Sequence, residues 1–293
     1  MTFGIETYSL TSFPCQAIIY SQMSERIKCR GFDILRYKPE TLVSPIPVLV
    51  APGFGTSADT YGLLLAELQS AGFVGLCPDY RWGATGEPKK LLFLPDVDRA
   101  KYQALLATIE HEGYPNEQEV RQVNVIAHSK GAIDIISVAR NHPENFRNIL
   151  LVAPGGVRDS NKGYVPELVR LAFADRRDRR DKARVEARGG EEAEWLLINK
   201  KSAVAYKRHW VRYFLESITA TKIIYQDFQY LRARGIRIAL IAQESDSMFP
   251  LDSYLFVKDN VDSFVELPGI HAEIKFNPAI ARRLIDMLKT PYL

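Results

Sequence analysis

The sequence predicts an α/β protein with a mostly parallel central sheet flanked by helices. Short, continuous apolar runs recur along the chain, as expected of strands that are buried on both faces of a sheet. Amphipathic helical patterns separate these runs, and this alternation favours parallel strands joined by right-handed crossovers. The 293 residues are 46% hydrophobic and 25% charged, which are globular values that allow a sizeable core.

The opening of the chain predicts antiparallel strands, and a buried strand follows them. Two runs around residues 8–20 and 27–37 are rich in aromatic and β-branched side chains, which favours strands. Residues 47–51 form a continuous apolar run before a glycine turn, as expected of a strand buried on both faces. A helix is then predicted from about Ser57 and should end at Gly72, because glycine commonly follows the last helical turn.

The same alternation continues to the end of the chain. Residues 96–112 have apolar side chains at helical spacing, and Gly113 is placed to end that helix. Another helix is predicted over residues 131–141. The remaining buried strands are predicted at residues 73–77, 123–127, 148–152, 236–242 and 263–267.

One long interval interrupts the alternation. Residues 154–235 show no strand pattern and instead carry helical patterns, with a dense run of charges over residues 175–188. We expect a helical insertion here, within a core formed by residues 1–153 and 236–293. The charge run is most simply a solvated helix with ion pairs between residues four apart, and binding of an anionic partner is the alternative.

Charge and hydropathy indicate few special partners. The net charge of +3 comes from 38 basic and 35 acidic residues, so the balance does not favour nucleic acid or a membrane surface as a partner. The first residues lack the basic and apolar segments of a secretory signal, and no stretch approaches the roughly 20 apolar residues of a membrane helix. We expect a cytoplasmic protein without stable membrane insertion, and the sequence leaves its oligomeric state open.

Three cysteines are too few for a disulfide framework or a cysteine-rich zinc site. Cys77 follows an apolar run in a predicted strand, which favours a buried, inert thiol. A disulfide between Cys15 and Cys29 across a hairpin stays open.

The most informative motif places a serine in a tight turn between a predicted strand and a predicted helix. The five residues Ala127-His128-Ser129-Lys130-Gly131 resemble the nucleophile elbow of the α/β-hydrolase superfamily, whose pattern is Gly-x-Ser-x-Gly. Small residues are needed because a strained turn brings neighbouring backbone close to the strand and the helix. Ala127 stands in place of the first glycine and is still small. Taken alone, the serine could also be a helix cap.

A second segment resembles the acid loop of the same superfamily. The predicted strand at 236–242 leads into a loop in which Asp246 stands four residues before a proline, as the family's aspartate does. Gln243 occupies a place that is often glycine. Glu244 and Asp252 are the competing carboxylates.

A third segment, Leu267-Pro268-Gly269-Ile270-His271, resembles the turn that delivers the family's histidine. His271 follows the end of a predicted strand, where open α/β sheets form their sites. The chain order Ser129, Asp246, His271 is also the order of this superfamily. The other histidines lie near predicted helix ends, in the insertion, or beside the serine and pointing away from its partner: His111, His142, His209 and His128.

The resemblance also implies an oxyanion hole, which requires backbone N–H donors directed at the developing negative charge. Lys130, directly after the serine, would supply one donor, and Phe54 in the loop after the 47–51 strand would supply the other. Pro52 stands where histidine is common in the family, and an ordinary glycine turn is the alternative. Asp79, after the next strand, is expected to be structural.

These residues together imply a catalytic triad. A serine hydroxyl is a weak nucleophile, so His271 would accept its proton while Asp246 orients the imidazole. An acyl-enzyme on Ser129 would form and then be hydrolysed by water. This chemistry requires no metal and no organic cofactor, and the sequence contains no HExxH, Walker A or GxGxxG motif.

In this superfamily an insertion at this position typically forms a cap over the site, so the resemblance implies that residues 154–235 do so. Aromatic side chains fall on one face of a predicted helix in the insertion, where packing within the cap is the alternative to substrate contact. They are Tyr206, Trp210, Tyr213 and Phe214, of which the last three are the candidate pocket residues.

The function expected from the resemblance is that of a serine esterase, a carboxylesterase or a lipase, acting on a small-molecule ester. A carbon–carbon bond hydrolase, a perhydrolase and an acyltransferase use the same triad, and a slow-turnover ligand-binding receptor of the same fold is a further alternative. Serine argues against the dehalogenase and epoxide-hydrolase branches, which would place aspartate at position 129. Acyl and alcohol specificity stay open.

Overall fold

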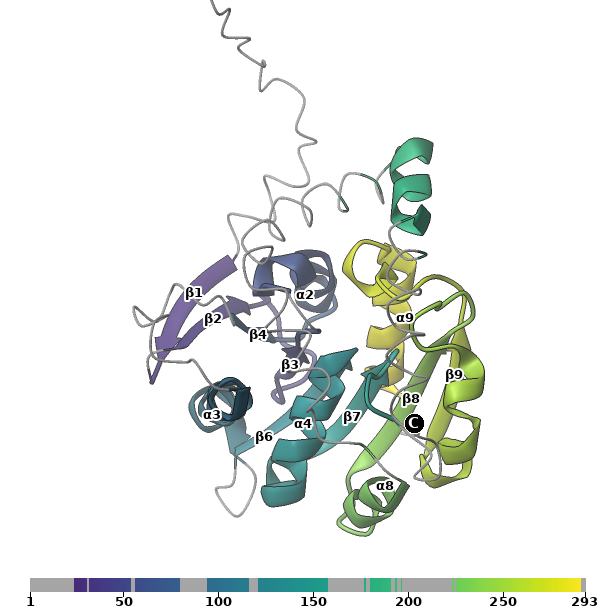
Figure 1. Cartoon of the computed structure of the whole chain (residues 1–293). Helices are drawn as coiled ribbons and strands as arrows, with labels where there is room; N and C mark the ends of the chain where they lie inside the picture. Colours follow the sequence, from purple (N-terminus) through teal and green to yellow (C-terminus); the bar gives the residue numbers. More distant parts are fainter. Residues whose placement is uncertain are drawn as a thin grey trace, which may run out of the picture.

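The computed structural model describes residues 24–30, 32–53, 56–79, 94–115, 121–157, 177, 180–190, 193, 196, 223 and 225–290. A central sheet lies between two layers of helices (Figure 1). The strands of the described part are β1 (Ser24–Cys29), β2 (Phe32–Tyr37), β3 (Val48–Ala51), β4 (Gly75–Asp79), β5 (Tyr114–Pro115), β6 (Arg121–His128), β7 (Phe146–Val152), β8 (Arg237–Gln243) and β9 (Ser263–Leu267).

The strand order confirms the predicted fold class. The sheet runs β1-β2-β4-β3-β6-β7-β8-β9, and the short β5 pairs with β6 outside this path. All neighbours from β4 to β9 along the path are parallel, whereas β1 with β2 and β2 with β4 are antiparallel. The inner parallel strands β3, β4, β6, β7 and β8 are almost wholly buried, which explains their apolar runs in the sequence, whereas the edge strand β9 is mostly half-buried.

The antiparallel opening differs in detail from the prediction. The run at 27–37 is not one strand: the chain turns back at Arg30, whose φ of 49° lies in the left-handed region, and β1 and β2 form a hairpin there. Such a turn requires a backbone conformation that the side-chain pattern does not encode. The predicted run at 8–20 lies outside the described residues.

Five helices of the described part cover the sheet in two layers. They are α2 (Gly62–Ser70), α3 (Leu94–Glu112), α4 (Lys130–Asn141), α8 (Tyr225–Arg232) and α9 (Pro278–Lys289), with shorter 3-10 turns η1 (Ala58–Tyr61), η2 (Pro143–Asn145), η4 (Leu251–Ser253), η5 (Leu255–Asn260) and η6 (Glu273–Lys275). Side chains of α3, α4 and α8 share one core with one face of the sheet, and those of α2 and α9 share a second core with the other face. The helices predicted at 96–112 and 131–141 are found within two residues of their predicted starts, and the one predicted from about Ser57 begins as the 3-10 turn η1. The predicted helix that carries Tyr206 lies outside the described residues.

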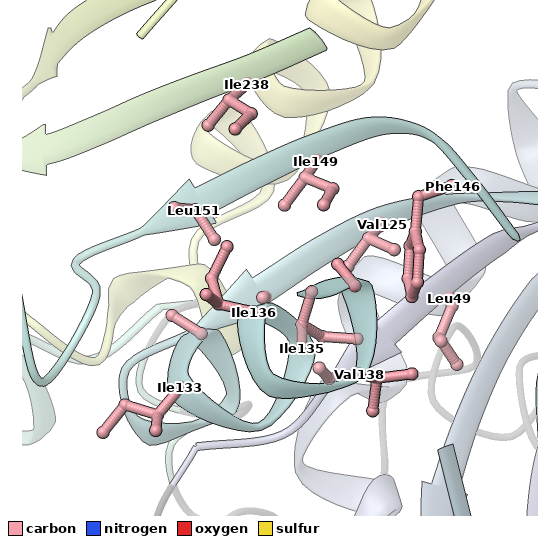
Figure 2. Close-up of a cluster of buried hydrophobic side chains, with 14 of the residues drawn as sticks. Leu49, Val125, Ile133, Ile135, Ile136, Val138, Phe146, Ile149, Leu151 and Ile238 are labelled. Carbon is pink, nitrogen blue, oxygen red and sulfur yellow. The ribbon is translucent and has the colours of Figure 1, made fainter. Parts of the chain in front are cut away.

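The packing of α4 shows which face of the sheet each residue of β6 occupies. Ile135 and Val138 of this helix point toward Leu49 and Val125 of the sheet (Figure 2). Along β6, Val125 and Ala127 belong to this core, whereas Ile126 belongs to the core beneath α2 and α9. His128, two residues after Ile126, therefore lies on the face covered by α2 and α9.

The insertion predicted at residues 154–235 is described only in parts. Residues 180–188 are helical and mostly exposed, with an ion pair between Arg184 and Asp181 at 2.8 Å, as expected of a solvated charged helix. The helix α8, although it lies within the predicted insertion, packs into the core through Phe228 and Leu231. The division of the chain into a core and a cap stays a prediction. No helix in the described ranges is long and apolar enough to cross a membrane.

Candidate active site

Ser129 occupies a strained turn between β6 and α4. Its φ of 53° and ψ of −123° are rare for a residue other than glycine. Two backbone hydrogen bonds hold it there: the Ser129 N–H donates to the Val152 carbonyl at 3.0 Å, and the Ser129 carbonyl accepts from the Gly155 N–H at 2.9 Å. The end of β7 and the loop that follows it therefore fix the serine on both sides of its Cα atom.

Close packing explains the small residues of the elbow. A Cβ atom at Gly131 would lie 2.3 Å from the Ala51 carbonyl oxygen and 2.7 Å from that of Pro52, so only glycine fits between α4 and the end of β3. Ala127 is completely buried in the sheet. The helix can thus start directly beside the strand that carries the serine.

The acid loop directs one carboxylate inward. Asp246 is 3% exposed, and its Oδ1 atom accepts the N–H groups of Met248 at 2.7 Å and Phe249 at 2.9 Å. These bonds fix the carboxylate and leave Oδ2 directed at His271. The competing carboxylates Glu244 and Asp252 are exposed.

The histidine turn is held by its own side-chain contacts. Gly269 has a φ of 117°, a conformation that favours glycine. The carboxylate of Glu273 accepts the Ile270 N–H and an N–H of the Asn277 side chain, each at 3.0 Å. This arrangement fixes the main chain on both sides of His271.

The structure brings together the three residues that the sequence predicts as a triad. His271 Nδ1 lies 2.8 Å from Asp246 Oδ2, and His271 Nε2 lies 3.0 Å from Ser129 Oγ. The carboxylate accepts the proton on Nδ1, so Nε2 of the neutral ring is free to accept the serine proton. All three residues are buried, and the Phe249 ring lies 5.3 Å from the His271 ring.

The other described histidines are not placed for this role. His111 is exposed and contacts Glu112, and His142 is half-buried at the end of α4. His209 lies outside the described residues. His128, however, does not simply point away: its Nε2 atom lies 2.8 Å from the His271 carbonyl oxygen, and the two rings are 4.8 Å apart.

Sequence reasoning missed this contact between His128 and His271, and also the one between His128 and Tyr61, whose hydroxyl lies 2.8 Å from His128 Nδ1. The alternation of β6 could have placed His128 on the face shared with Ile126. Burial lowers the pKa of His128 well below the usual histidine value, and the nearby charges of His271 and Lys275 lower it further.

The predicted oxyanion donors are only partly described. Lys130 begins α4 directly after the serine, and its ammonium pairs with Asp134 at 3.0 Å in a buried position. The Gly53 N–H donates to the Tyr61 hydroxyl at 2.8 Å, so this group is already used by the protein. Phe54 lies outside the described residues, and the same holds for the candidate pocket residues Trp210, Tyr213 and Phe214.

Two further expectations concern residues outside the triad. Asp79 pairs with Arg26 at 2.9 Å, which ties β4 to the hairpin and agrees with a structural role. Cys29 is a free, buried thiol that donates to the Ala107 carbonyl at 3.3 Å, and Cys15 lies outside the described residues. Burial raises the pKa of the Cys77 thiol well above its usual range, as expected of an inert cysteine.

A sequence model of the alpha/beta hydrolase family matches residues 48–269 of the chain. A search of curated proteins finds no match. Among solved structures, a serine hydrolase from the polyaromatic-hydrocarbon-degrading bacterium Cycloclasticus zankles is similar, with 14% identity and a TM-score of 0.64 over 91% of this chain and 97% of that chain.

Two other solved structures share the fold at equally low identity. An esterase from Thermogutta terrifontis is 15% identical, with a TM-score of 0.59 over 92% of this chain and 99% of that chain. A 2-hydroxy-6-oxo-6-phenylhexa-2,4-dienoate hydrolase from a Rhodococcus species is 18% identical, with a TM-score of 0.63 over 91% of this chain and all of that chain. Since the family match spans most of the sequence and the strand order agrees with it, this chain belongs to the α/β-hydrolase family.

Proposed function

We propose that this protein is a serine hydrolase that cleaves carboxylic esters through an acyl-enzyme on Ser129. The observation that carries the proposal is the continuous hydrogen-bonded chain from Ser129 Oγ through His271 to Asp246, with distances of 3.0 and 2.8 Å. The serine is held in a strained elbow, which is typical of a nucleophile rather than of a helix cap, and its side chain makes no cap hydrogen bond.

Acylation begins when an ester carbonyl lies against Ser129. His271 Nε2 takes the hydroxyl proton as Oγ forms a bond to the carbonyl carbon, and the carbonyl oxygen becomes negatively charged. The N–H groups of Lys130 and Phe54 stabilise this charge in the proposal. Collapse of the intermediate breaks the bond to the alcohol oxygen, which takes the proton from His271, and leaves the acyl group on Ser129.

Deacylation repeats the same steps with water. His271 removes a proton from the water as its oxygen attacks the acyl carbon, and the proton then returns to Ser129 Oγ as the carboxylic acid leaves. Asp246 stays ionised throughout, holds the Nδ1–H tautomer and stabilises the imidazolium. Its two backbone hydrogen bonds keep it in this orientation.

The insertion is proposed to act as a cap that contacts the substrate and selects among acyl groups. Val185 and Leu196 are buried in one cluster with Leu63, Ala272 and Phe276, so parts of the insertion pack beside the histidine turn. Within such a cap, Trp210, Tyr213 and Phe214 are the proposed pocket residues. A pocket of this kind discriminates through shape, at about 1 to 3 kcal/mol per methylene of the acyl chain.

The proposal is tested by activity and by covalent labelling. Wild-type protein should hydrolyse p-nitrophenyl esters and react with a fluorophosphonate, and Ser129→Ala should lose both, with kcat lower by about 10⁶. Ser137→Ala, which removes a hydroxyl further along α4, is the matched control and should keep both. Labelling of Ser129→Ala at the wild-type rate would refute the assignment.

The substrate panel also separates the alternatives. A series of p-nitrophenyl esters of increasing acyl length reports the pocket, and a diketone-like substrate tests carbon–carbon bond cleavage. Faster turnover of the diketone than of every ester, again lost in Ser129→Ala, would keep the triad but replace the proposed ester substrate.

A further inference from the structure

Three hydrogen bonds connect the two segments that the proposed reaction needs. The Gly53 N–H donates to the Tyr61 hydroxyl at 2.8 Å, and that hydroxyl lies 2.8 Å from His128 Nδ1. His128 Nε2 lies 2.8 Å from the main-chain carbonyl oxygen of His271. One end of this chain is the residue before the proposed oxyanion donor Phe54, and the other end is the main chain of the proposed base.

The chemistry of the partners fixes the direction of each bond. A carbonyl oxygen can only accept, so the proton of His128 must be on Nε2. In the neutral ring Nδ1 then accepts, and the Tyr61 hydroxyl donates to it while its oxygen accepts the Gly53 N–H. Tyr61 is fully buried and His128 is 1% exposed, so water does not compete for these groups.

The surroundings keep His128 neutral. Burial is the main cause of its lowered pKa; the protonated form of His271 and the charges of Lys275 and Lys182 lower it further, whereas the hydrogen bond to the His271 carbonyl raises it. The His128 and His271 rings are 4.8 Å apart. A neutral neighbour does not oppose the positive charge that His271 gains when it takes the serine proton, whereas a protonated His128 would.

The backbone of Gly53 also packs directly against His128. A Cβ atom at Gly53 would lie 2.9 Å from His128 Nδ1 and 3.1 Å from Ser129 Cβ. The backbone of Gly53 is therefore pressed against both side chains. A change in the place of the imidazole must move this loop or break its hydrogen bond to Tyr61.

We infer that His128 is a positioning residue, which holds the His271 main chain and, through Tyr61, the Gly53 loop in register with Ser129. The inference rests on the proposed function, because it gives His128 a part in the same reaction. His128 acts through its neighbours and not on the substrate. A displacement of about 1 Å at a reacting group can lower the rate about 100-fold, so small shifts of His271 or the loop matter.

Two substitutions test the roles of the two nitrogen atoms of the His128 imidazole separately. The amide of His128→Gln reaches the place of Nε2 and can still donate to the His271 carbonyl, whereas that of His128→Asn reaches only the place of Nδ1. We expect kcat to fall about 100-fold in His128→Asn but by no more than about tenfold in His128→Gln. The KM should stay within about twofold of the wild-type value in both variants. His142→Asn, a half-buried histidine at the end of α4, is the control and should keep its kcat.

A second readout needs no substrate. The proton shared by His271 Nδ1 and Asp246 Oδ2 should give a far-downfield ¹H NMR signal, and this signal should move or broaden in His128→Asn but stay in His128→Gln. Equal kcat losses in the two variants, or no loss in either, would overturn the inference. If the wild type hydrolyses no ester and takes up no fluorophosphonate, the proposed function fails, while the NMR comparison still decides whether His128 positions His271.

A milder substitution, Tyr61→Phe, tests the inference even if His128→Asn does not fold. Tyr61→Phe removes only the hydroxyl between Gly53 and His128, and we expect kcat to fall about tenfold with little change in KM. Tyr230→Phe is its matched control, because it removes an exposed hydroxyl that donates to the Arg140 carbonyl at 3.2 Å. Wild-type kcat in Tyr61→Phe would contradict the part of the inference that concerns the loop.

Discussion

The parallel strands begin at one edge of the sheet, the amino edge, and finish at the other, the carboxyl edge. Backbone strain differs between these two edges. At the carboxyl ends of β6 and β7, Ser129 and Ala153 have φ angles of 53° and 43°. At the amino end of β8, the corresponding turn has a φ of 80° but uses Gly235, for which this conformation is not strained. Among the described residues, strained turns at Ser129 and Ala153 therefore follow β6 and β7, whereas the turn before β8 uses glycine.

Polar side chains at the two ends of the strands also differ. At the amino ends, the half-buried Asn148 donates to the side chain of the buried Asn124 at 2.7 Å, and the exposed Asp262 accepts from the Ile238 N–H and the Arg232 side chain, each at 2.8 Å. At the carboxyl end of β8, both polar atoms of the Gln243 amide are buried and have no hydrogen-bond partner among the described residues. The polar contacts at the amino edge therefore contribute to stability, and the carboxyl edge carries the proposed chemistry.

After Ser129→Ala, the largest loss of activity is expected from a substitution at Asp246, at the carboxyl edge. Asp246→Asn should lower kcat about 10⁴-fold because the amide cannot hold the correct tautomer of His271. The melting temperature should change little, since the size of the side chain is kept. Glu244→Gln is the matched control, because Glu244 is an exposed carboxylate in the same loop, and its kcat should stay near wild type. Similar losses in both variants would move the role away from Asp246.

The amino edge should respond in the opposite way. Asn124→Val leaves the Asn148 amide without its partner, so we expect the free energy of unfolding in urea to fall by about 1–3 kcal/mol. The value of kcat/KM should stay at the wild-type level. Replacing Asn148 by valine as well should restore part of the stability, because no unpaired amide remains. A loss of activity without a loss of stability would contradict the division between the edges.

The smallest effect concerns pH and His128. Because burial lowers its pKa in the folded state, the unfolded chain takes up a proton below about pH 6.5 that the folded protein does not. The stability due to this group is thus fully present above that pH and is lost as the pH falls, by at most about 1.4 kcal/mol per pH unit. His128→Gln lacks this dependence, so its stability should approach that of the wild type between pH 7 and 5. Parallel curves in urea unfolding would show that His128 titrates alike in both states.

The sequence predicts most of the core because burial on both faces leaves a simple signal. The strand β3 is wholly apolar and β6, β7 and β8 each contain an apolar stretch that is buried, so their places follow from the pattern of apolar residues. The hairpin of β1 and β2 was not predicted correctly, since its turn depends on the backbone of Arg30 and not on a side-chain pattern.

The triad residues can be predicted for a related reason, whereas the residues that position them, such as His128, cannot. Each triad residue follows the end of a parallel strand, where the loops of neighbouring strands come together. His128 contacts Tyr61 and His271, which are separated from it by 67 and 143 positions along the chain. Only the folded structure reveals such contacts. The predicted roles of Phe54, Trp210, Tyr213 and Phe214 stay predictions.

The most direct test of the central claim is to isolate the acyl-enzyme. Wild-type protein is mixed with p-nitrophenyl acetate, quenched with acid before the adduct is hydrolysed, digested and analysed by mass spectrometry. The account predicts a burst of one p-nitrophenolate per protein molecule and an added acetyl group on the peptide that contains Ser129. Turnover with an acetyl group on another residue, or with an unmodified Ser129 peptide throughout the burst, would contradict it.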